Sequence, residues 1–348
     1  MRKTFHFLLS TLFLLSSFLI ASCAPAGPTT LTIMTHDSFA ISEDVVTAFE
    51  QANNVDVVFL ASGDTGTMLN KAILAKDAPF ADVMFGVDNT FLSRALEADI
   101  FDAYQSPALS DVSAEFVLDS SFRALPVDYS DVCINYDKKY FEENNLAVPQ
   151  SFEDLTKPEY NGLLAVENPA TSSPGLAFML ATRAYFGDGF LDYWQSLKDN
   201  GVVVVDSWET AYYTNFSASS GQGPQPMVVS YASSPAAEVF FASELLTESP
   251  TGSIGASGMC FRQIEFVGIL KNGQNRDLAE KFVDFMLDRQ FQEDMPLNMF
   301  VYPVNQSAQL PEVFTQHTQV ASQPAAITYA DIAANRDTWI EAWAEIMK

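Results

Sequence analysis

LTIMTHDSFAISEDVVTAFEQANNVDVVFLASGDTGTMLNKAILAKDAPFADVMFGVDNTFLSRALEA, residues 31–98, is the stretch that decides the fold. Its apolar runs at 31–35, 55–60 and 81–86 predict strands. Helices are predicted between and after these strands. One begins after Ser42, which is expected to cap it, and the other two span 67–76 and 89–98. This alternation of strands and helices predicts a parallel sheet with helices on both faces, an α/β fold.

The same alternation returns in the second part of the chain. We predict strands over 163–166, 202–205 and 227–230, the valine run 202–205 being a buried strand. Helices are predicted over 174–185, 208–216 and 235–246. Between the two parts lie the extended apolar segments 128–136 and 260–270, which are expected to cross from one lobe to the other and back. Helices over 275–292 and 329–347 are expected to close the fold.

Composition and charge narrow the class of protein. The chain has 348 residues, of which 48% are hydrophobic and 18% charged, so a packed core is expected and disorder is excluded. Lys and Arg number 18 against 44 Asp and Glu, a net charge of −26. We expect no nucleic-acid partner, because phosphate binding needs a basic surface. Three cysteines are too few for a disulfide scaffold or a cysteine-rich zinc module.

The N-terminus has the features of an export signal. Arg2 and Lys3 precede an apolar run over 5–20, which ends in small residues before Cys23. The run Leu-Ile-Ala-Ser-Cys resembles a bacterial lipobox, which implies cleavage after residue 22 and lipidation of Cys23; an ordinary signal peptide is the alternative. Residues 23–30 then form a tether rich in Pro and Gly. Since no later apolar run reaches the roughly 20 residues of a membrane span, the lipid is the expected membrane attachment.

Polar and aromatic residues follow the predicted strands, where open parallel sheets bind their ligands. The loops contain His36-Asp37, Asp88-Asn89, Ser172-Ser173, Asp206-Ser207-Trp208 and Tyr231 to Ser234. They lack a nucleophile elbow, a phosphate-binding Walker loop and a metal-binding pair of histidines on one helix turn. This pattern favours a binding protein without a cofactor or metal over an enzyme.

In order along the chain, several motifs resemble those of the thiamine-binding subunit of bacterial ABC importers. They are Thr-His-Asp-Ser-Phe at 35–39, Gly-Val-Asp-Asn at 86–89, Pro-Val-Asp-Tyr at 126–129, Thr-Ser-Ser-Pro-Gly at 171–175, Trp-Glu-Thr-Ala-Tyr at 208–212, Ser-Tyr-Ala-Ser-Ser-Pro-Ala at 230–236 and Tyr-Pro-Val at 302–304. The resemblance covers residues 31–346. It implies a two-lobed periplasmic-binding fold of the second type with two hinge crossings. Lobe 1 would comprise 31–130 and 262–348, and lobe 2 would comprise 131–261.

The resemblance further implies a monomeric protein, exported to the periplasm or the outer face of the membrane. It would capture thiamine or a thiamine phosphate and deliver it to the permease. Aromatic rings would stack on the ligand and carboxylates would face its thiazolium cation. The expected ligand-binding residues are His36, Asp37, Asp88, Asn89, Asp128, Tyr129, Ser172, Ser173, Trp208, Tyr231, Ser233, Ser234 and Phe300.

Three positions depart from the family pattern. His36 stands where the family usually has Tyr, Ala237 replaces an aromatic residue, and Phe300 replaces a Trp. These departures bear on the choice of ligand more than on the fold.

Most of the candidates also have a plain structural interpretation. Asp88 is also suited to cap a helix that begins at Asn89, and the serines are suited to cap the helices that follow them. Phe300 is suited to pack in a core. For Trp208 the structural alternative is a hydrophobic staple at the start of a helix.

Other ligands and another class of protein remain open from the residues alone. A polyamine would need several spaced carboxylates, and ferric iron would need Tyr212, Tyr213 and His36 to converge. An exported thiamine-related enzyme would need a nucleophile, but Cys133 and Cys260 fall in the extended crossings rather than in loops. If the crossings run side by side, these two cysteines form a disulfide across the hinge; two separate buried thiols are the alternative.

Overall fold

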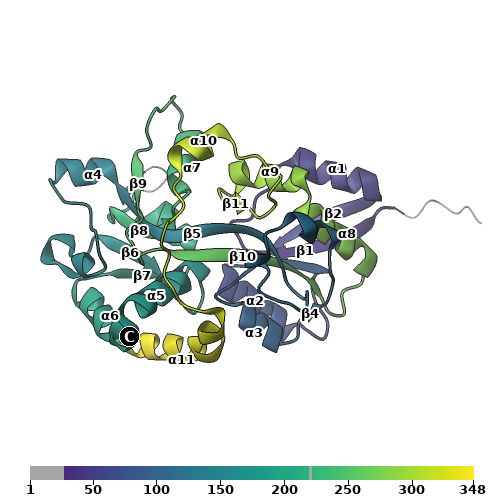
Figure 1. Ribbon diagram of the computed structural model, residues 1–348, viewed down its shortest axis with the longest axis horizontal. Helices are drawn as coiled ribbons and strands as arrows, with labels where there is room; N and C mark the ends of the chain where they lie inside the picture. Colours follow the sequence, from purple (N-terminus) through teal and green to yellow (C-terminus); the bar gives the residue numbers. More distant parts are fainter. Residues whose placement is uncertain (1–26, 219–221) are drawn as a thin grey trace, which may run out of the picture.

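The computed structural model describes residues 27–218 and 222–348. The predicted signal segment 1–22, Cys23 and most of the tether lie outside the described residues. In the part that is described, eleven strands join in one sheet, in the order β2-β1-β3-β10-β5-β8-β6-β7, with β4, β9 and β11 paired at its sides. Helices surround this sheet in two groups (Figure 1).

The first group belongs to the first half of the molecule, which we define as the part built around β2, β1 and β3. Along the chain it contains β1 (Thr29–Thr35), α1 (Glu43–Asn53), β2 (Val55–Ala61), α2 (Thr65–Leu74), β3 (Val83–Asp88), α3 (Leu92–Glu97) and β4 (Phe101–Asp102), with α8 (Arg276–Leu287) and α9 (Arg289–Asn298) added later. β1 pairs in parallel with both β2 and β3. The predicted alternation is confirmed here.

The second half is built around β8, β6 and β7. It contains α4 (Lys138–Glu143), β6 (Leu164–Glu167), α5 (Ser173–Phe186), α6 (Phe190–Asp199), β7 (Val203–Val205), the π-helix η6 (Thr210–Asn215), β8 (Met227–Tyr231), α7 (Ser234–Phe240) and β9 (Thr251–Ile254). β6 pairs in parallel with β7 and β8. The valine strand β7 is only partly buried, contrary to the sequence prediction, because it lies at the edge of the sheet.

Two long strands connect the halves, as predicted. β5 (Leu125–Asp137) and β10 (Phe261–Leu270) run antiparallel to each other between β3 and β8, so the sheet as a whole is mixed rather than parallel. The first part of β5 pairs with β10 and β11 (Tyr302–Pro303), and its last part pairs with β8 and β9. Each long strand is therefore shared by both halves.

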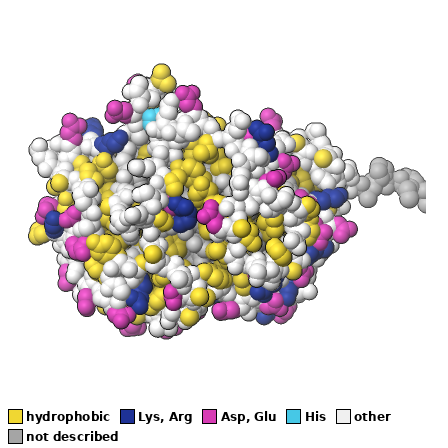
Figure 2. Space-filling model, viewed as in Figure 1, with side chains coloured by type: hydrophobic (Ala, Val, Ile, Leu, Met, Phe, Trp, Pro, Cys, Tyr) yellow, Lys and Arg dark blue, Asp and Glu magenta, His cyan; other side chains and the backbone are white. Residues whose placement is uncertain are grey.

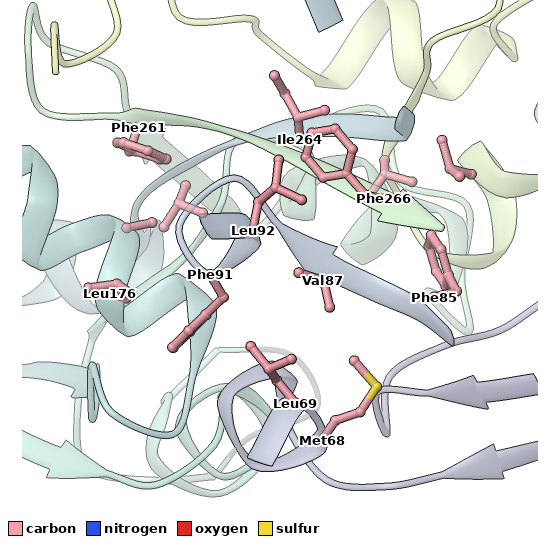
Figure 3. Packing of buried hydrophobic residues seen from close by; sticks show 14 of the residues in the cluster. Met68, Leu69, Phe85, Val87, Phe91, Leu92, Leu176, Phe261, Ile264 and Phe266 are labelled. Carbon is pink, nitrogen blue, oxygen red and sulfur yellow. The ribbon is translucent and has the colours of Figure 1, made fainter. Parts of the chain in front are cut away.

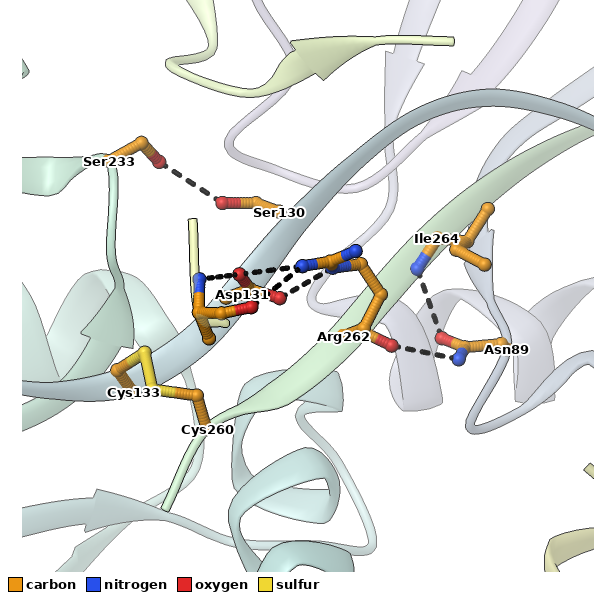
Figure 4. A network of polar contacts seen from close by, with 9 residues as sticks. Asn89, Ser130, Asp131, Cys133, Ser233, Cys260, Arg262 and Ile264 are labelled. Carbon is orange, nitrogen blue, oxygen red and sulfur yellow. Dashed lines mark hydrogen bonds and ion pairs between the residues drawn. A yellow bond between two sulfur atoms is a disulfide. The ribbon is translucent and has the colours of Figure 1, made fainter. Parts of the chain in front are cut away.

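A disulfide and an ion pair join the two crossing strands. Val132 of β5 lies opposite Phe261 of β10, and the next residues along, Cys133 and Cys260, form a disulfide with their Cα atoms 4.4 Å apart. Asp131 accepts two hydrogen bonds from Arg262, at 2.6 and 3.0 Å (Figure 4). These contacts hold β5 and β10 in register where the chain crosses.

The core extends through both halves and beneath the crossing strands. Figure 3 shows side chains from α2, β3, α3, α5 and β10 packed together, among them Leu69, Phe85, Leu92, Leu176 and Phe266. All of these side chains are buried. The core therefore joins the helices of both halves to the sheet.

The C-terminal segment passes over the crossing and then reaches both halves. After α10 (Glu312–His317) the chain runs across β5 and β10 to α11 (Tyr329–Met347), as Figure 1 shows. Trp343 of α11 contacts Trp194 of α6, with ring centroids 5.5 Å apart. Arg336 of α11 is buried and donates a hydrogen bond to Ser93 Oγ of α3, at 3.1 Å. The predicted division into two lobes places α11 with lobe 1, but its contacts link it to both.

Four helix predictions differ from the structure, one in its cap and three in their bounds by three residues or more. Ser42 precedes α1, but its hydroxyl donates to Asp294 and does not cap the helix. The helix expected to begin at Asn89 begins at Leu92, and the single helix expected over 275–292 is interrupted at Asp288, where the backbone is extended. The helix expected over 235–246 ends at Phe240.

The short connecting helices are 3-10 segments: η1 (Pro107–Asp111), η2 (Ala114–Phe116), η3 (Glu153–Thr156), η4 (Pro158–Tyr160) and η5 (Gly187–Gly189).

Figure 2 shows Asp and Glu side chains distributed over both halves of the visible face. None of the helices in 27–218 and 222–348 combines the length and hydropathy that a bilayer span requires.

Candidate ligand-binding site

A cavity of about 360 Å³ lies between the two halves, and both contribute to its walls. The first half supplies the loop after β1 and the start of α2, and the second half supplies the starts of α5 and α7 and the region around η6. Glu265 of β10 and the segment after α9 complete the lining. The cavity residues of most consequence are His36, Asp37, Asp64, Ser173, Trp208, Tyr212, Tyr231, Ser234, Glu238, Phe241, Glu265 and Phe300.

Aromatic rings form much of the wall on the second half. The Trp208 and Tyr212 rings are stacked, with centroids 5.1 Å apart, and the Tyr231 ring lies 6.1 Å from that of Trp208. Trp208 Nε1 donates to Ser230 Oγ at 2.9 Å, which fixes the orientation of the indole. Because these rings are held by neighbours, they offer flat faces to a planar ligand without the cost of ordering them.

Phe300 forms the wall from the segment that follows α9. Its ring lies 5.4 Å from that of Phe241 and 5.8 Å from that of Phe240, both at the end of α7. Its φ of 55° is in the left-handed region, which a bulky side chain rarely adopts. The ring of Phe300 is therefore held at the junction of the two halves by a strained backbone conformation.

Carboxylates supply the polar part of the lining. Asp37, Asp64, Glu209, Glu238 and Glu265 all line the cavity, and within the described residues no Lys or Arg does so. Glu238 accepts a hydrogen bond from the Tyr212 hydroxyl. Burial raises the pKa of Asp64 above its usual value, although hydrogen bonds from backbone N–H groups oppose the shift. The cavity is therefore suited to a cation with flat rings.

His36 is the basic residue of the lining. Its Nε2 lies 3.5 Å from Glu265 Oε1. Burial on its own lowers the pKa of His36, but Glu265, Asp64 and Asp37 outweigh it and raise the pKa above 6.5. A Cβ atom at Gly86 would collide with the imidazole, and the φ of Gly86 is +101°, so a glycine is needed beneath this ring.

The structure brings seven of the predicted site residues to the cavity: His36, Asp37, Ser173, Trp208, Tyr231, Ser234 and Phe300. The others lie behind it or to its side. Asp88 and Asp128 are buried in the sheet beneath the cavity, and Ser172 is buried at the start of α5. Ser233 contacts Ser130 Oγ at 3.1 Å (Figure 4).

Asn89 and Tyr129 have structural partners instead of cavity positions. Asn89 bonds to β10 through its amide group, donating to Arg262 O and accepting from Ile264 N, both at 3.0 Å (Figure 4). Tyr129 stacks between Phe116 and Tyr302, with centroids 4.7 and 5.2 Å away. Both residues therefore fix the crossing strands that carry the site.

Several cavity residues are absent from the sequence prediction. Asp64 lies in the loop after the strand predicted over 55–60, so its position was a usable signal. Glu265 and Phe241 gave no such signal, because one lies inside a crossing strand and the other at the end of α7.

The alternative of an iron site depends on how Tyr212 and Tyr213 lie. Tyr212 is buried against Trp208 and Glu238, whereas the Tyr213 ring is turned by 85° from it and is about half exposed. Within the described residues no group of three or more His, Cys, Asp or Glu side chains is arranged to hold a metal ion.

Known proteins resemble this chain over most of its length. Residues 78–321 match the family of bacterial extracellular solute-binding proteins. The thiamine-binding periplasmic protein of Escherichia coli K12 is 29% identical over 326 residues, which are 90% of this chain and 92% of that protein. The thiamine-binding periplasmic protein of Brucella suis is 27% identical over 96% of this chain and 98% of its own. A solved periplasmic thiamin-binding protein superposes with a TM-score of 0.81 at 27% identity, covering 92% of this chain and 97% of that one.

Proposed function

The chain belongs to the bacterial extracellular solute-binding proteins, and from this premise we propose that it captures thiamine or a thiamine phosphate outside the cytoplasmic membrane. It would deliver this ligand to the permease of an ABC importer. Relatives named for thiamine binding match nearly the full length of the chain and support this assignment. No bond is made or broken in this function, and no cofactor takes part.

The observation that carries the proposal is the chemistry of the cavity wall. Thiamine combines a flat aminopyrimidine with a thiazolium cation. The cavity offers the stacked rings of Trp208 and Tyr212 together with Tyr231, carboxylates from both halves, and no Lys or Arg within the described residues. A desolvated cation over an aromatic ring gains about 2 kcal/mol or more, so this wall favours thiamine over an anion of similar size. Its volume of about 360 Å³ falls within the range of small-molecule sites, about 300–1,000 Å³.

Closure of the two halves would complete the site. Trp208 N of the second half donates to Asp64 Oδ2 of the first half at 3.0 Å. Ligand enclosed between the halves would stabilise this contact, and the closed shape would be the form presented to the permease. The hydroxyl end of thiamine, or its phosphate, would lie toward Ser173 at the start of α5, where the helix dipole is positive.

Export and lipid attachment through Cys23 are part of the same proposal. The test is incorporation of radiolabelled palmitate by cells that express the full chain, with the Cys23→Ser variant as control. Label in the wild type and none in the variant supports lipidation. Equal labelling of both, or of neither, overturns it.

The ligand assignment is tested by isothermal titration of protein that has been unfolded, stripped of ligand and refolded. Thiamine, its mono- and diphosphates, hydroxymethylpyrimidine, spermidine and Fe³⁺ are titrated in turn. We expect thiamine or one of its phosphates to bind at least a hundredfold more tightly than spermidine. Binding of Fe³⁺ or spermidine alone would replace the assignment with the corresponding cation.

A further inference from the structure

Three carboxylates lie in one row across adjacent strands beneath the cavity. Glu265 of β10 stands opposite Asp88 of β3 on one side and opposite Asp128 of β5 on the other. Directly opposite residues point to the same face of a sheet, with Cβ atoms about 4.5–5.5 Å apart. We call Asp88, Asp128 and Glu265 the acid row. Glu265 reaches the cavity, while the other two are buried behind it.

The two buried members of the acid row, Asp88 and Asp128, lack partners that suit a charged carboxylate. Asp88 Oδ1 accepts from Thr90 Oγ1 at 2.7 Å, but Asp88 Oδ2 and both oxygens of Asp128 have no hydrogen-bond donor among the described residues. Asp128 lies directly opposite Glu265 in the β5–β10 pairing, so a charged Asp128 would face a second carboxylate. Buried carboxylates without donors retain a proton rather than a charge.

The surrounding groups add negative charge rather than relieve it. Asp37 and Asp64 face His36 from the first half, and Glu167 of β6 lies near Asp64 and Tyr231 from the second half. His36 is the basic neighbour of the row, with its Nε2 3.5 Å from Glu265 Oε1. Burial raises the pKa of Asp88 to about 8 and also raises the pKa of Asp128, to which the neighbouring carboxylates contribute.

We propose that Asp88 and Asp128 of the acid row, together with His36, store protons in the empty protein and release one when a cationic ligand enters the cavity. The ligand's positive charge next to Glu265 takes the place of the proton's charge, so the net charge of the site is conserved and the proton passes to solvent. This inference rests on the proposed function, because it requires the ligand to be a cation. It makes ligand capture sensitive to pH outside the cell.

The sign of the pH effect follows from linkage. The empty protein holds more protons than the complex, so lowering the pH favours the empty protein and weakens binding. Release of one whole proton would change the dissociation constant tenfold per pH unit, and partial release correspondingly less. We expect the affinity for thiamine to rise about three- to tenfold per pH unit between pH 6 and pH 8.

The experiment is isothermal titration with thiamine at pH 6, 7 and 8, in buffers that differ in ionisation enthalpy. The difference in heat between buffers gives the number of protons released. Between a half and one proton is expected near pH 7. If thiamine binds without proton release and its affinity changes by less than twofold between pH 6 and pH 8, this inference alone is overturned. If thiamine does not bind at any pH, the proposed function is overturned with it.

Variants show whether the proton comes from the acid row. Asp128→Asn preserves side-chain shape and removes one titrating group that does not line the cavity; Asp88→Asn serves the same purpose if the first variant does not fold. Either is expected to release at most half as many protons as the wild type. Asp56→Asn, at an exposed position on β2, is the matched control and should behave as the wild type. Unchanged release in both acid-row variants would overturn the proposal, because the proton would then come from thiamine or another group.

Discussion

A methyl group at Gly66 is expected to weaken ligand binding without entering the cavity. Gly66 lies in the first turn of α2, where its N–H donates to Thr171 O of the second half at 3.0 Å. A Cβ atom added there would lie 2.7 Å from Ala170 O and 2.9 Å from Thr171 O. Ordinary contacts of this kind begin near 3.4 Å, so Gly66→Ala must move the two backbones apart by several tenths of an ångström.

The size of the effect follows from the cost of overpacking, about 1–3 kcal/mol. This cost applies only while the halves touch, whereas the gain in helix propensity from Gly to Ala, about 1 kcal/mol, applies whether or not they touch. The variant therefore favours separated halves, and a ligand that binds the closed form must offset the difference. At 1.4 kcal/mol for each tenfold, thiamine affinity should fall about 5- to 150-fold.

The assay is isothermal titration of thiamine, with thermal unfolding of the empty protein beside it. Gly189→Ala is the matched control, since a Cβ at Gly189 meets no atom within 4 Å and its φ of −80° suits alanine. The control should bind as the wild type does. If Gly66→Ala binds thiamine as tightly as the control, contact between α2 and the loop before α5 plays no part in ligand capture.

Three further predictions concern the cavity wall, a buried acid and the disulfide. Trp208→Ala should weaken thiamine binding about 5- to 30-fold through the loss of roughly 1–2 kcal/mol of stacking, while Trp339→Ala on α11 should not; titration measures both. Asp88→Asn should raise the melting temperature relative to wild type increasingly from pH 4 to pH 8, because burial raises the pKa of Asp88 to about 8, so the folded wild type keeps a proton that the unfolded chain loses as the pH rises; a difference independent of pH would contradict this. Replacing both Cys133 and Cys260 by Ser should lower the unfolding free energy by about 2–5 kcal/mol in urea titrations, since the disulfide closes a loop of 127 residues; unchanged stability would show that the crossing strands are constrained without it.

Local patterns were sufficient to predict the main parallel strands along the chain and the two crossings. The strands at 31–35, 55–60 and 81–86 are apolar runs between amphipathic helices, and each is present with small shifts at its ends. The shift at α3 has a tertiary cause. Asn89 is drawn into hydrogen bonds with β10, so the helix starts three residues later than the local pattern indicates.

The site could be predicted where it depends on loops after strands and not where it depends on register. Trp208 and Tyr231 follow strands in the sequence and line the cavity. Asp88 also follows the strand predicted over 81–86, but the position of its side chain is set by pairing with Glu265, far away in the chain. No local pattern contains that pairing, and so neither the acid row nor the role of Glu265 was apparent from the sequence.

The C-terminal helix restricts how far the molecule can open. Its Trp343 is packed on α6, and Lys198 Nζ donates to Ile346 O at 2.7 Å, so this end of the helix travels with α6. Arg336 is 2% exposed and lies over the Phe91 ring on the opposite side of the crossing. A wide rotation would pull this guanidinium out of its enclosure, so the contacts of α11 limit how far the two halves of the empty protein can separate.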